Sequence, residues 1–174
     1  MLRRDFTRPT ARASALALAL LAVPLAVAAL SPSPVEAASA SQELTIKVSR
    51  VTLLDKVDEL SKGDLYARVT IDGEVQSSPV VKGENVLKPD WKLSKKVTPG
   101  DHKVKVELVD KDVTQDDTID INRVDKKRDL DFTVNTKSCK IEGFSSTYRC
   151  GSTITRTGQE PKKAEIAFTV SVKK

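Results

Sequence analysis

Aspartates are crowded into one short stretch of the chain, which reads Val109-Asp110-Lys111-Asp112-Val113-Thr114-Gln115-Asp116-Asp117-Thr118-Ile119. Its four carboxylates repel one another unless a cation or a basic partner neutralises them. Asp110 and Asp112 project from the same side of an extended segment, so both can reach one ion. Hard cations such as Ca²⁺ take carboxylate and carbonyl oxygens from flexible loops of this kind. The alternative is a solvated hairpin tip, because aspartate also favours turns.

A second acidic group occurs earlier, in the polar stretch 55–64, and contains Asp55, Asp58, Glu59 and Asp64. Each acidic group follows a segment with the pattern of a β-strand. Loops at the same end of a β-sandwich lie side by side. If these two loops share an end, their carboxylates converge on one pocket, where repulsion is costly without a cation. The pair therefore predicts a calcium site more sharply than either loop alone.

The elements that position these loops are short β-strands. Apolar and polar residues alternate with the period of a half-buried strand, over the segments 44–48, 65–71, 91–97, 102–109, 130–134 and 164–172. Shorter strands are predicted at 75–82, where Pro79 favours a sheet edge, and at 119–121. A cysteine hairpin and then a polar stretch to Pro161 are expected between 139 and 161. No helical periodicity is present, so the chain is predicted to be all-β, an antiparallel β-sandwich of about eight strands.

The first 40 residues have the pattern of a secretory signal peptide. Four arginines precede a run of Ala, Leu and Val over 13–30, and small-x-small cleavage sites follow at 35–37 and 38–40. A retained membrane anchor is the alternative, because the apolar run is about long enough to span a bilayer. Pro24 argues against that reading. We expect a cleaved segment 1–40, a folded domain over 41–174, and a secreted, extracellular protein.

Two cysteines, Cys139 and Cys150, are present, and in an exported chain they are predicted to form a disulfide bond. The loop they close is short, so the bond would pin a local hairpin at 139–150. The chain carries 29 Lys and Arg against 24 Asp and Glu, a net charge of +5. From Ser39 onward the net charge is only +3, since part of the basicity belongs to the first residues. This balance does not indicate a nucleic-acid-binding protein.

Several motifs occur in a fixed order along the chain. They are Leu44-x-Ile46-x-Val48, Gly63-Asp64-Leu65-Tyr66-Ala67-Arg68-Val69, Pro89-Asp90-Trp91, Val109-Asp110-Lys111-Asp112 and Asp117-Thr118-Ile119. Their order resembles the C2 domain, a calcium- and phospholipid-binding β-sandwich. The family pattern has Asp-Pro-Tyr-Val on the second strand, Asn-Pro-x-Trp on the fourth, and Asp-x-Asp then Asp-x-Ile-Gly at the third calcium loop. The resemblance covers roughly residues 44–134, and the segment 164–172 fits the eighth C2 strand. With its signal peptide, the chain is identified as a C2-like domain in a small exported protein of bacterial type.

The resemblance implies a metal site. The family binds Ca²⁺ through five aspartates, and the matching positions here are Asp58, Asp64, Asp110, Asp112 and Asp117. Asp116 is the fallback for the last of these, and Trp91 is expected in or near the core. The chain departs from the family at Leu65, where the family has Pro, and at Asp120, where it has Gly.

Four lysines cluster around the predicted fourth strand: Lys88, Lys92, Lys95 and Lys96. In the C2 family, a basic patch on that strand meets anionic lipid headgroups, which implies an anionic membrane or cell-wall partner here. The alternative is a solvated outer face, on which lysines protect the sheet from edge pairing. The lone histidine, His102, is expected at the surface because no nucleophile accompanies it.

These observations predict a secreted C2-like binding module that binds calcium and bridges it to an anionic lipid or cell-surface polymer. The alternative is a calcium-independent extracellular module, such as a protease inhibitor or an adhesion protein. That module would use the cysteine hairpin or the basic strand. We do not expect an enzyme, because no catalytic residue pair, glycine-rich phosphate loop or zinc-ligand cluster can be read from the sequence.

Overall fold

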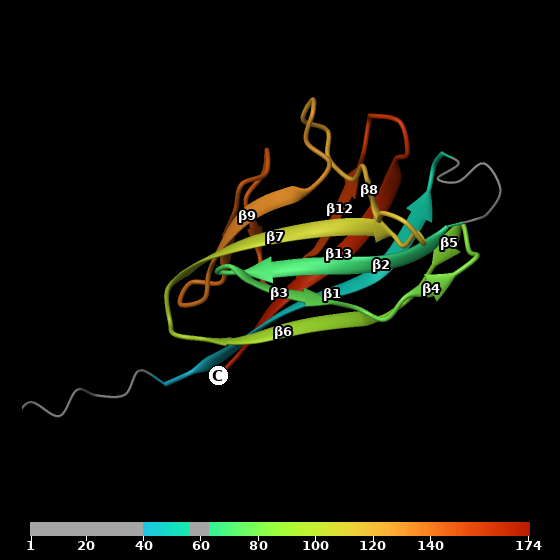
Figure 1. Ribbon diagram of the computed structural model, residues 1–174. Helices are drawn as coiled ribbons and strands as arrows, with labels where there is room; N and C mark the ends of the chain where they lie inside the picture. Colours follow the sequence, from blue (N-terminus) through green and yellow to red (C-terminus); the bar gives the residue numbers. More distant parts are fainter. Residues whose placement is uncertain (1–39, 56–62) are drawn as a thin grey trace, which may run out of the picture. The chain divides into compact units, whose positions relative to one another are not determined.

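The structure, a computed structural model, describes residues 40–55 and 63–174, which form two antiparallel β-sheets (Figure 1). One sheet contains β1 (Gln42–Leu53), β5 (Val86–Leu87), β6 (Trp91–Val97), β12 (Thr153–Thr157) and β13 (Ala164–Lys173). The other contains β2 (Asp64–Ile71), β3 (Glu74–Ser77), β4 (Val81–Lys82), β7 (Asp101–Asp110), β8 (Asp117–Ile119), β9 (Leu130–Asn135), β10 (Lys140–Glu142) and β11 (Tyr148–Arg149). Within the described ranges, no helix is long and apolar enough to cross a membrane.

The predicted all-β antiparallel sandwich is confirmed. Many of its strands are pieces of longer, interrupted ones. Both β3 and β4 pair with β2, both β5 and β6 pair with β1, and both β8 and β9 pair with β7. The break between β3 and β4 holds Pro79, which has no backbone N–H to donate to a ladder. Pro79 thus lies on an edge of the sheet, as its type predicts.

The core lies between the two sheets and follows the alternation of the sequence. On β1 the residues Leu44, Ile46 and Val48 are completely buried, while the residues between them face outward. Across the sandwich, the rings of Phe132 on β9 and Phe168 on β13 stack with centroids 5.8 Å apart. Burial of each large apolar side chain contributes about 1.5–3 kcal/mol, so this continuous core holds the two sheets together.

The sequence interpretation fails over residues 153–157, which form the edge strand β12 and not a polar loop. Only one apolar residue, Ile154, points into the core, and it pairs with Phe168 on β13. The other residues of β12 are threonines and an arginine, so no alternation of apolar residues marks the strand. Threonine nevertheless suits a half-exposed strand, because its β-branched side chain packs on the pleated surface.

The surface position predicted for His102 is wrong, since this side chain is only 6% exposed. His102 belongs to the alternate residues of β7 that face inward, together with Val104 and Val106. Its Nδ1 lies 2.6 Å from Asp72 Oδ2, and its Nε2 lies 2.7 Å from the carbonyl oxygen of Thr98. The ring is therefore a structural polar contact at the end of the sandwich where β7 begins.

The disulfide bond between Cys139 and Cys150 is confirmed, with Cα atoms 5.2 Å apart. It flanks the short strands β10 and β11, and the Cys150 N–H donates to the Cys139 carbonyl oxygen (3.1 Å). The bond lies beside the short strands β10 and β11 and does not join the central strands of either sheet. It therefore fixes a local hairpin, as its short sequence separation of 11 residues implies.

Replacing Cys139 and Cys150 together by Ser is expected to lower the free energy of unfolding by about 2–3 kcal/mol, the entropy of closing so short a loop. Urea denaturation of the variant and the oxidised wild type measures this difference. The denaturant slope should stay nearly constant, because the sandwich core remains intact. Complete unfolding of the variant at room temperature would contradict a purely local role.

Acid is expected to weaken the contact between His102 and Asp72. Partial burial raises the pKa of the Asp72 carboxyl, but hydrogen bonds from His102 and from the Lys103 N–H outweigh it, so the pKa lies below its ordinary value. Asp72 therefore stabilises the fold above about pH 4, and this contribution is lost as the pH falls through the lowered value. An Asp72→Asn variant should be less stable than wild type at pH 7 and equally stable near pH 2. A stability difference that does not change with pH would refute this.

Candidate functional site

The candidate site is the end of the sandwich where β2 and β8 begin and β7 ends, called here the acidic end. Strand register brings its aspartates together, because Asp110 pairs directly with Asp117 on one side and with Leu65, next to Asp64, on the other. The Asp64 N–H donates to Asp110 Oδ1 (2.6 Å). The Lys111 N–H donates to the Asp64 carbonyl oxygen (2.8 Å). Three predicted ligands thus lie on three adjacent strand ends.

Asp110 is the most enclosed of these residues, with a side chain that is 1% exposed. The neighbouring Gly63 has a φ angle of +75°, a left-handed conformation that favours glycine. A Cβ atom added to Gly63 would lie only 3.2 Å from Asp110 Oδ1. Glycine at this position therefore keeps the space beside the Asp110 carboxylate clear.

The five predicted calcium ligands do not all lie together in the described part of the structure. The structure brings Asp64, Asp110 and Asp117 together, and Asp112 lies two residues beyond the end of β7. Asp58 lies outside the described residues. Among residues 40–55 and 63–174, no three His, Cys, Asp or Glu side chains are grouped closely enough to hold a metal ion. Calcium binding therefore stays a prediction, supported by the oxygen chemistry of the donors and by their strand positions.

Lysines that the sequence analysis did not select neutralise two of these aspartates. The Lys82 ammonium on β4 lies 3.4 Å from Asp64 Oδ2. The Lys162 ammonium, in the loop between β12 and β13, forms an ion pair with Asp117 Oδ2. The hydrogen bond to Asp117 raises the pKa of Lys162 against the effect of partial burial, and the charges of Asp112 and Asp110 add to it.

The fallback ligand, Asp116, has both of its oxygens engaged. Tyr66 donates its hydroxyl to Asp116 Oδ2 (2.7 Å), and the Asp112 N–H donates to Oδ1 (3.2 Å). The hydrogen bond from Tyr66 is the main cause that holds the pKa of Asp116 below its ordinary value. Asp116 thus fixes the fold of the loop between β7 and β8, and Asp117 is the residue that pairs with Asp110.

A buried carboxylate connects the acidic end to the loop that carries Lys162. The Asp120 side chain is fully buried and accepts three backbone hydrogen bonds. Oδ1 accepts from Asn122 N–H (2.9 Å), and Oδ2 accepts from the N–H groups of Gln159 (2.7 Å) and Glu160 (2.6 Å). The departure from the family's glycine at this position therefore has a structural reason.

The backbone of Asp120 strengthens the same connection. Its N–H donates to the Lys162 carbonyl oxygen (2.8 Å), and its carbonyl oxygen accepts from the Ala164 N–H (2.8 Å). Gly158 passes so close that a Cβ atom there would lie 2.1 Å from the Asp120 carbonyl oxygen. The loop between β12 and β13 is thus fixed to the end of β8, and Lys162 is held beside Asp117.

The four lysines predicted as a basic patch do not act as a unit. Lys88, Lys92 and Lys96 are exposed, whereas Lys95 is turned toward the edge of the sandwich. The Lys95 ammonium donates to the Ile71 carbonyl oxygen (2.9 Å) and lies 3.4 Å from Glu74 Oε2. Lys95 lies on the inward-facing side of β6, like Trp91 and Leu93. Its ammonium group therefore reaches the other sheet and connects the two. The outward face of β6 presents Lys92 and Lys96.

A small hollow at the acidic end combines apolar and basic side chains. The exposed residue Val113, at the tip of the loop after β7, and Val80, between β3 and β4, both line it. Lys82 and Lys111 lie on the same hollow. The sequence predicts only the aspartates of this hollow, because Val80 and Lys82 are distant in sequence from the other residues.

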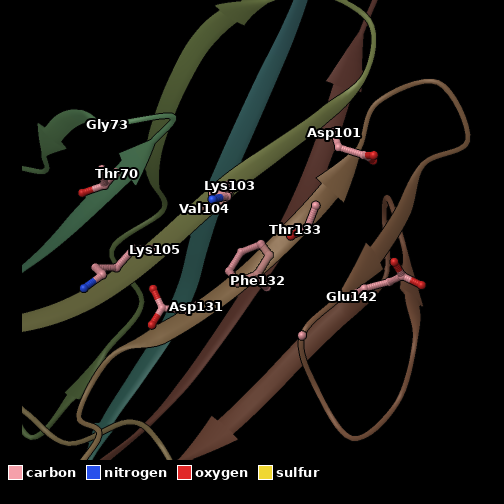
Figure 2. Close-up of a pocket in the computed structure, with 11 residues that line it drawn as sticks. Thr70, Gly73, Asp101, Lys103, Val104, Lys105, Asp131, Phe132, Thr133 and Glu142 are labelled. Atoms are coloured by element: carbon pink, nitrogen blue, oxygen red, sulfur yellow. The ribbon is translucent and has the colours of Figure 1, made fainter.

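A larger groove of about 610 Å³ crosses β2, β7 and β9 on the second sheet (Figure 2). Figure 2 shows Asp131, Phe132 and Thr133 following one another along β9, with Glu142 on the neighbouring β10. Its lining carries acidic side chains (Asp101, Asp131, Glu142) and basic ones (Lys103, Lys105), and Lys105 pairs with Asp129 (2.6 Å). This mixed charge does not favour either an anionic or a cationic ligand.

Comparison with protein families matches residues 42–139, more than half of the chain, to the C2 domain. No match is found among curated proteins. Among solved structures, one described as "Structure of a C2 domain" has a TM-score of 0.52 and 12% identity, over 77% of this chain and 99% of that chain. A calcium-bound structure of the two tandem C2 domains of Extended-Synaptotagmin 2 has a TM-score of 0.50 and 18% identity, over 75% of this chain and 45% of that one.

Human GIVD cytosolic phospholipase A2 has a TM-score of 0.47 and 15% identity, over 75% of this chain. The chain covers 16% of the length of that enzyme. At these identities, the likeness to the two C2-domain structures concerns the fold alone.

Removing the Asp120 carboxylate should loosen the loop that carries Lys162. An Asp120→Ala variant leaves three backbone N–H groups without their acceptor, so we expect a loss of about 2–4 kcal/mol in the free energy of unfolding. Amide hydrogen exchange should rise at Gln159 and Glu160. Asp131→Ala, in the mixed groove, is a control that should change stability by less than about 0.5 kcal/mol. Equal effects of the two substitutions would contradict the role of Asp120.

Proposed function

The chain belongs to the C2 domain family, and we propose that it acts as a calcium-binding module that docks on an anionic surface. The observation that carries this proposal is the register that pairs Asp110 with Asp117 and sets Asp64 beside them. Carboxylate oxygens on neighbouring strand ends are the donors that Ca²⁺ prefers. Calcium-bound C2 domains of Extended-Synaptotagmin 2 share this fold.

The residues that would hold the ion are Asp58, Asp64, Asp110, Asp112 and Asp117. When bound, calcium would neutralise these carboxylates and present a positive charge to an anionic partner. The protein's own contribution is positional. Hydrogen bonding to the Asp64 N–H fixes one oxygen of Asp110, and the left-handed Gly63 lets the backbone lie close to that oxygen.

The acidic end also has groups suited to an anionic surface. Val80 and Val113 are exposed there, and Lys82 and Lys111 line the same hollow. Each lysine near a negatively charged membrane contributes about 1 kcal/mol to the free energy of binding. An apolar tip flanked by lysines favours phospholipid headgroups or a cell-surface polymer over a neutral partner. A binding role of this kind needs no catalytic residue, so we propose that the module is not an enzyme.

We also propose that the protein is exported and acts outside the cell, with residues 1–40 as its signal peptide. The support is the disulfide bond between Cys139 and Cys150, because such bonds persist in oxidising compartments. Determining the N-terminus of the protein recovered from culture fluid tests this directly. Export predicts a new N-terminus near residues 38–41.

A second candidate is a calcium-independent interaction module that uses the hairpin at 139–150. It is favoured by one observation, namely that a disulfide bond fixes a hairpin with exposed residues Ser145 and Ser146. Capture from culture fluid with and without a chelator separates the two candidates. Replacing Cys139 and Cys150 by Ser would abolish binding only in the second case.

Calcium should raise the melting temperature of the wild-type protein. For a dissociation constant of about 0.1–1 mM, typical of extracellular modules, 10 mM calcium adds about 1.4–2.7 kcal/mol to the free energy of unfolding. Asp112→Asn should remove most of this gain. Asp125→Asn, on the exposed loop before β9, is the matched control and should keep it. A melting temperature of the wild type that stays flat up to 10 mM calcium would refute the calcium site.

Vesicle sedimentation tests the docking step. We expect the protein to sediment with vesicles of phosphatidylserine and phosphatidylcholine in calcium, and to stay in solution in chelator or with phosphatidylcholine alone. Val113→Asp should weaken sedimentation without changing the calcium-dependent melting temperature, because Val113 is fully exposed. Equal sedimentation with and without calcium would place the anionic contact elsewhere.

A further inference from the structure

Lys162 places its ammonium group at the acidic end, although it comes from the distant loop between β12 and β13. It forms an ion pair with Asp117, whose partner on the neighbouring strand is Asp110. One lysine therefore neutralises a predicted calcium ligand that lies directly opposite a second one on the neighbouring strand. Lys82 forms an ion pair with another predicted ligand, Asp64.

Hydrogen bonds of the backbone around Lys162 hold this residue beside Asp117. Its carbonyl oxygen accepts from the Asp120 N–H (2.8 Å), and the Asp120 carboxylate holds the preceding residues Gln159 and Glu160. Lys162 has a φ angle of +62°, a left-handed conformation uncommon outside glycine, asparagine and aspartate. A non-glycine residue keeps such a conformation only where its surroundings over-determine it. Here the surroundings direct a lysine side chain toward Asp117.

We propose that the ammonium group of Lys162 is a tethered counter-ion that occupies the acidic end in the absence of metal, and that calcium binds there by displacing it. The inference rests on the proposed calcium function and adds its regulation. Without metal, Lys162 offsets the repulsion between Asp117 and the facing Asp110. With metal, the same side chain competes, so it sets the calcium concentration at which the site fills.

The neighbouring Lys163 provides a matched control. It carries the same charge one residue further on, but its ammonium lies 3.6 Å from Asp55 Oδ1. Removing either lysine changes the net charge equally. A difference between the two variants therefore measures contact with the acidic end and not a general change of charge. Lys162→Arg keeps the charge, and Lys162→Met keeps the length of the side chain and the Cβ atom.

The test measures calcium affinity by isothermal titration calorimetry for wild type, Lys162→Met, Lys162→Arg and Lys163→Met. We expect Lys162→Met to bind calcium about five- to tenfold more tightly than wild type, because a contacting charge is removed. Lys163→Met should change the affinity by less than about twofold, because exposed charges farther away are screened. Lys162→Arg should resemble wild type. In the absence of calcium, Lys162→Met should melt at a lower temperature than Lys163→Met.

A second measurement follows the lysine itself. The side-chain Cε–Hε signal of Lys162, assigned by its loss in Lys162→Arg, should move toward the position of a free lysine as calcium is added. The Lys163 signal should stay in place. If wild type binds calcium but Lys162→Met binds equally and the Lys162 signal does not move, the displacement is refuted and the calcium function stands. If no variant binds calcium, both are refuted.

Discussion

Repulsion among carboxylates at one end of the sandwich is the constraint on which the local architecture depends. Antiparallel register sets Asp117 opposite Asp110 and Asp64 beside it, so the fold cannot separate these charges without breaking its own ladder. Backbone N–H groups and lysines satisfy them instead. The Asp64 N–H donates to Asp110, and lysines from β4 and from the loop after β12 pair with Asp64 and Asp117. Part of the negative charge is thus balanced by groups of the chain itself.

One buried residue makes this balance possible across the two sheets. Asp120 stands at the end of the second sheet's β8, yet its carboxylate accepts hydrogen bonds from Gln159 and Glu160, which precede β13 of the first sheet. A carboxylate that is fully buried is tolerated only with such partners. Glycine, which the family has at this position, supplies no such acceptor. Asp120 therefore couples the loop carrying Lys162 to the candidate calcium site.

The sequence predicts the fold well because the two-residue period of strands β1, β2, β6, β7 and β13 is strong. Motif order likewise predicts that the loops around Asp64 and Asp110 meet at one end. Contacts between distant segments could not be predicted in this way. Lys162 is 45 residues from Asp117, and its effect depends on a loop held by Asp120. The strand β12 was missed for a simpler reason, since Ile154 is its one core residue.

The two surfaces that compete for a functional role lie at opposite ends of β7. Asp110 ends this strand, whereas Asp101 begins it and pairs with Asn135, a few residues before the disulfide bond at Cys139. A strand of ten residues spans about 30 Å at ~3.3 Å per residue. At that separation, charges in salt solution are screened from one another. Changes at Cys139 and Cys150 therefore leave the electrostatics of the acidic end intact, and each surface can be altered without disturbing the other.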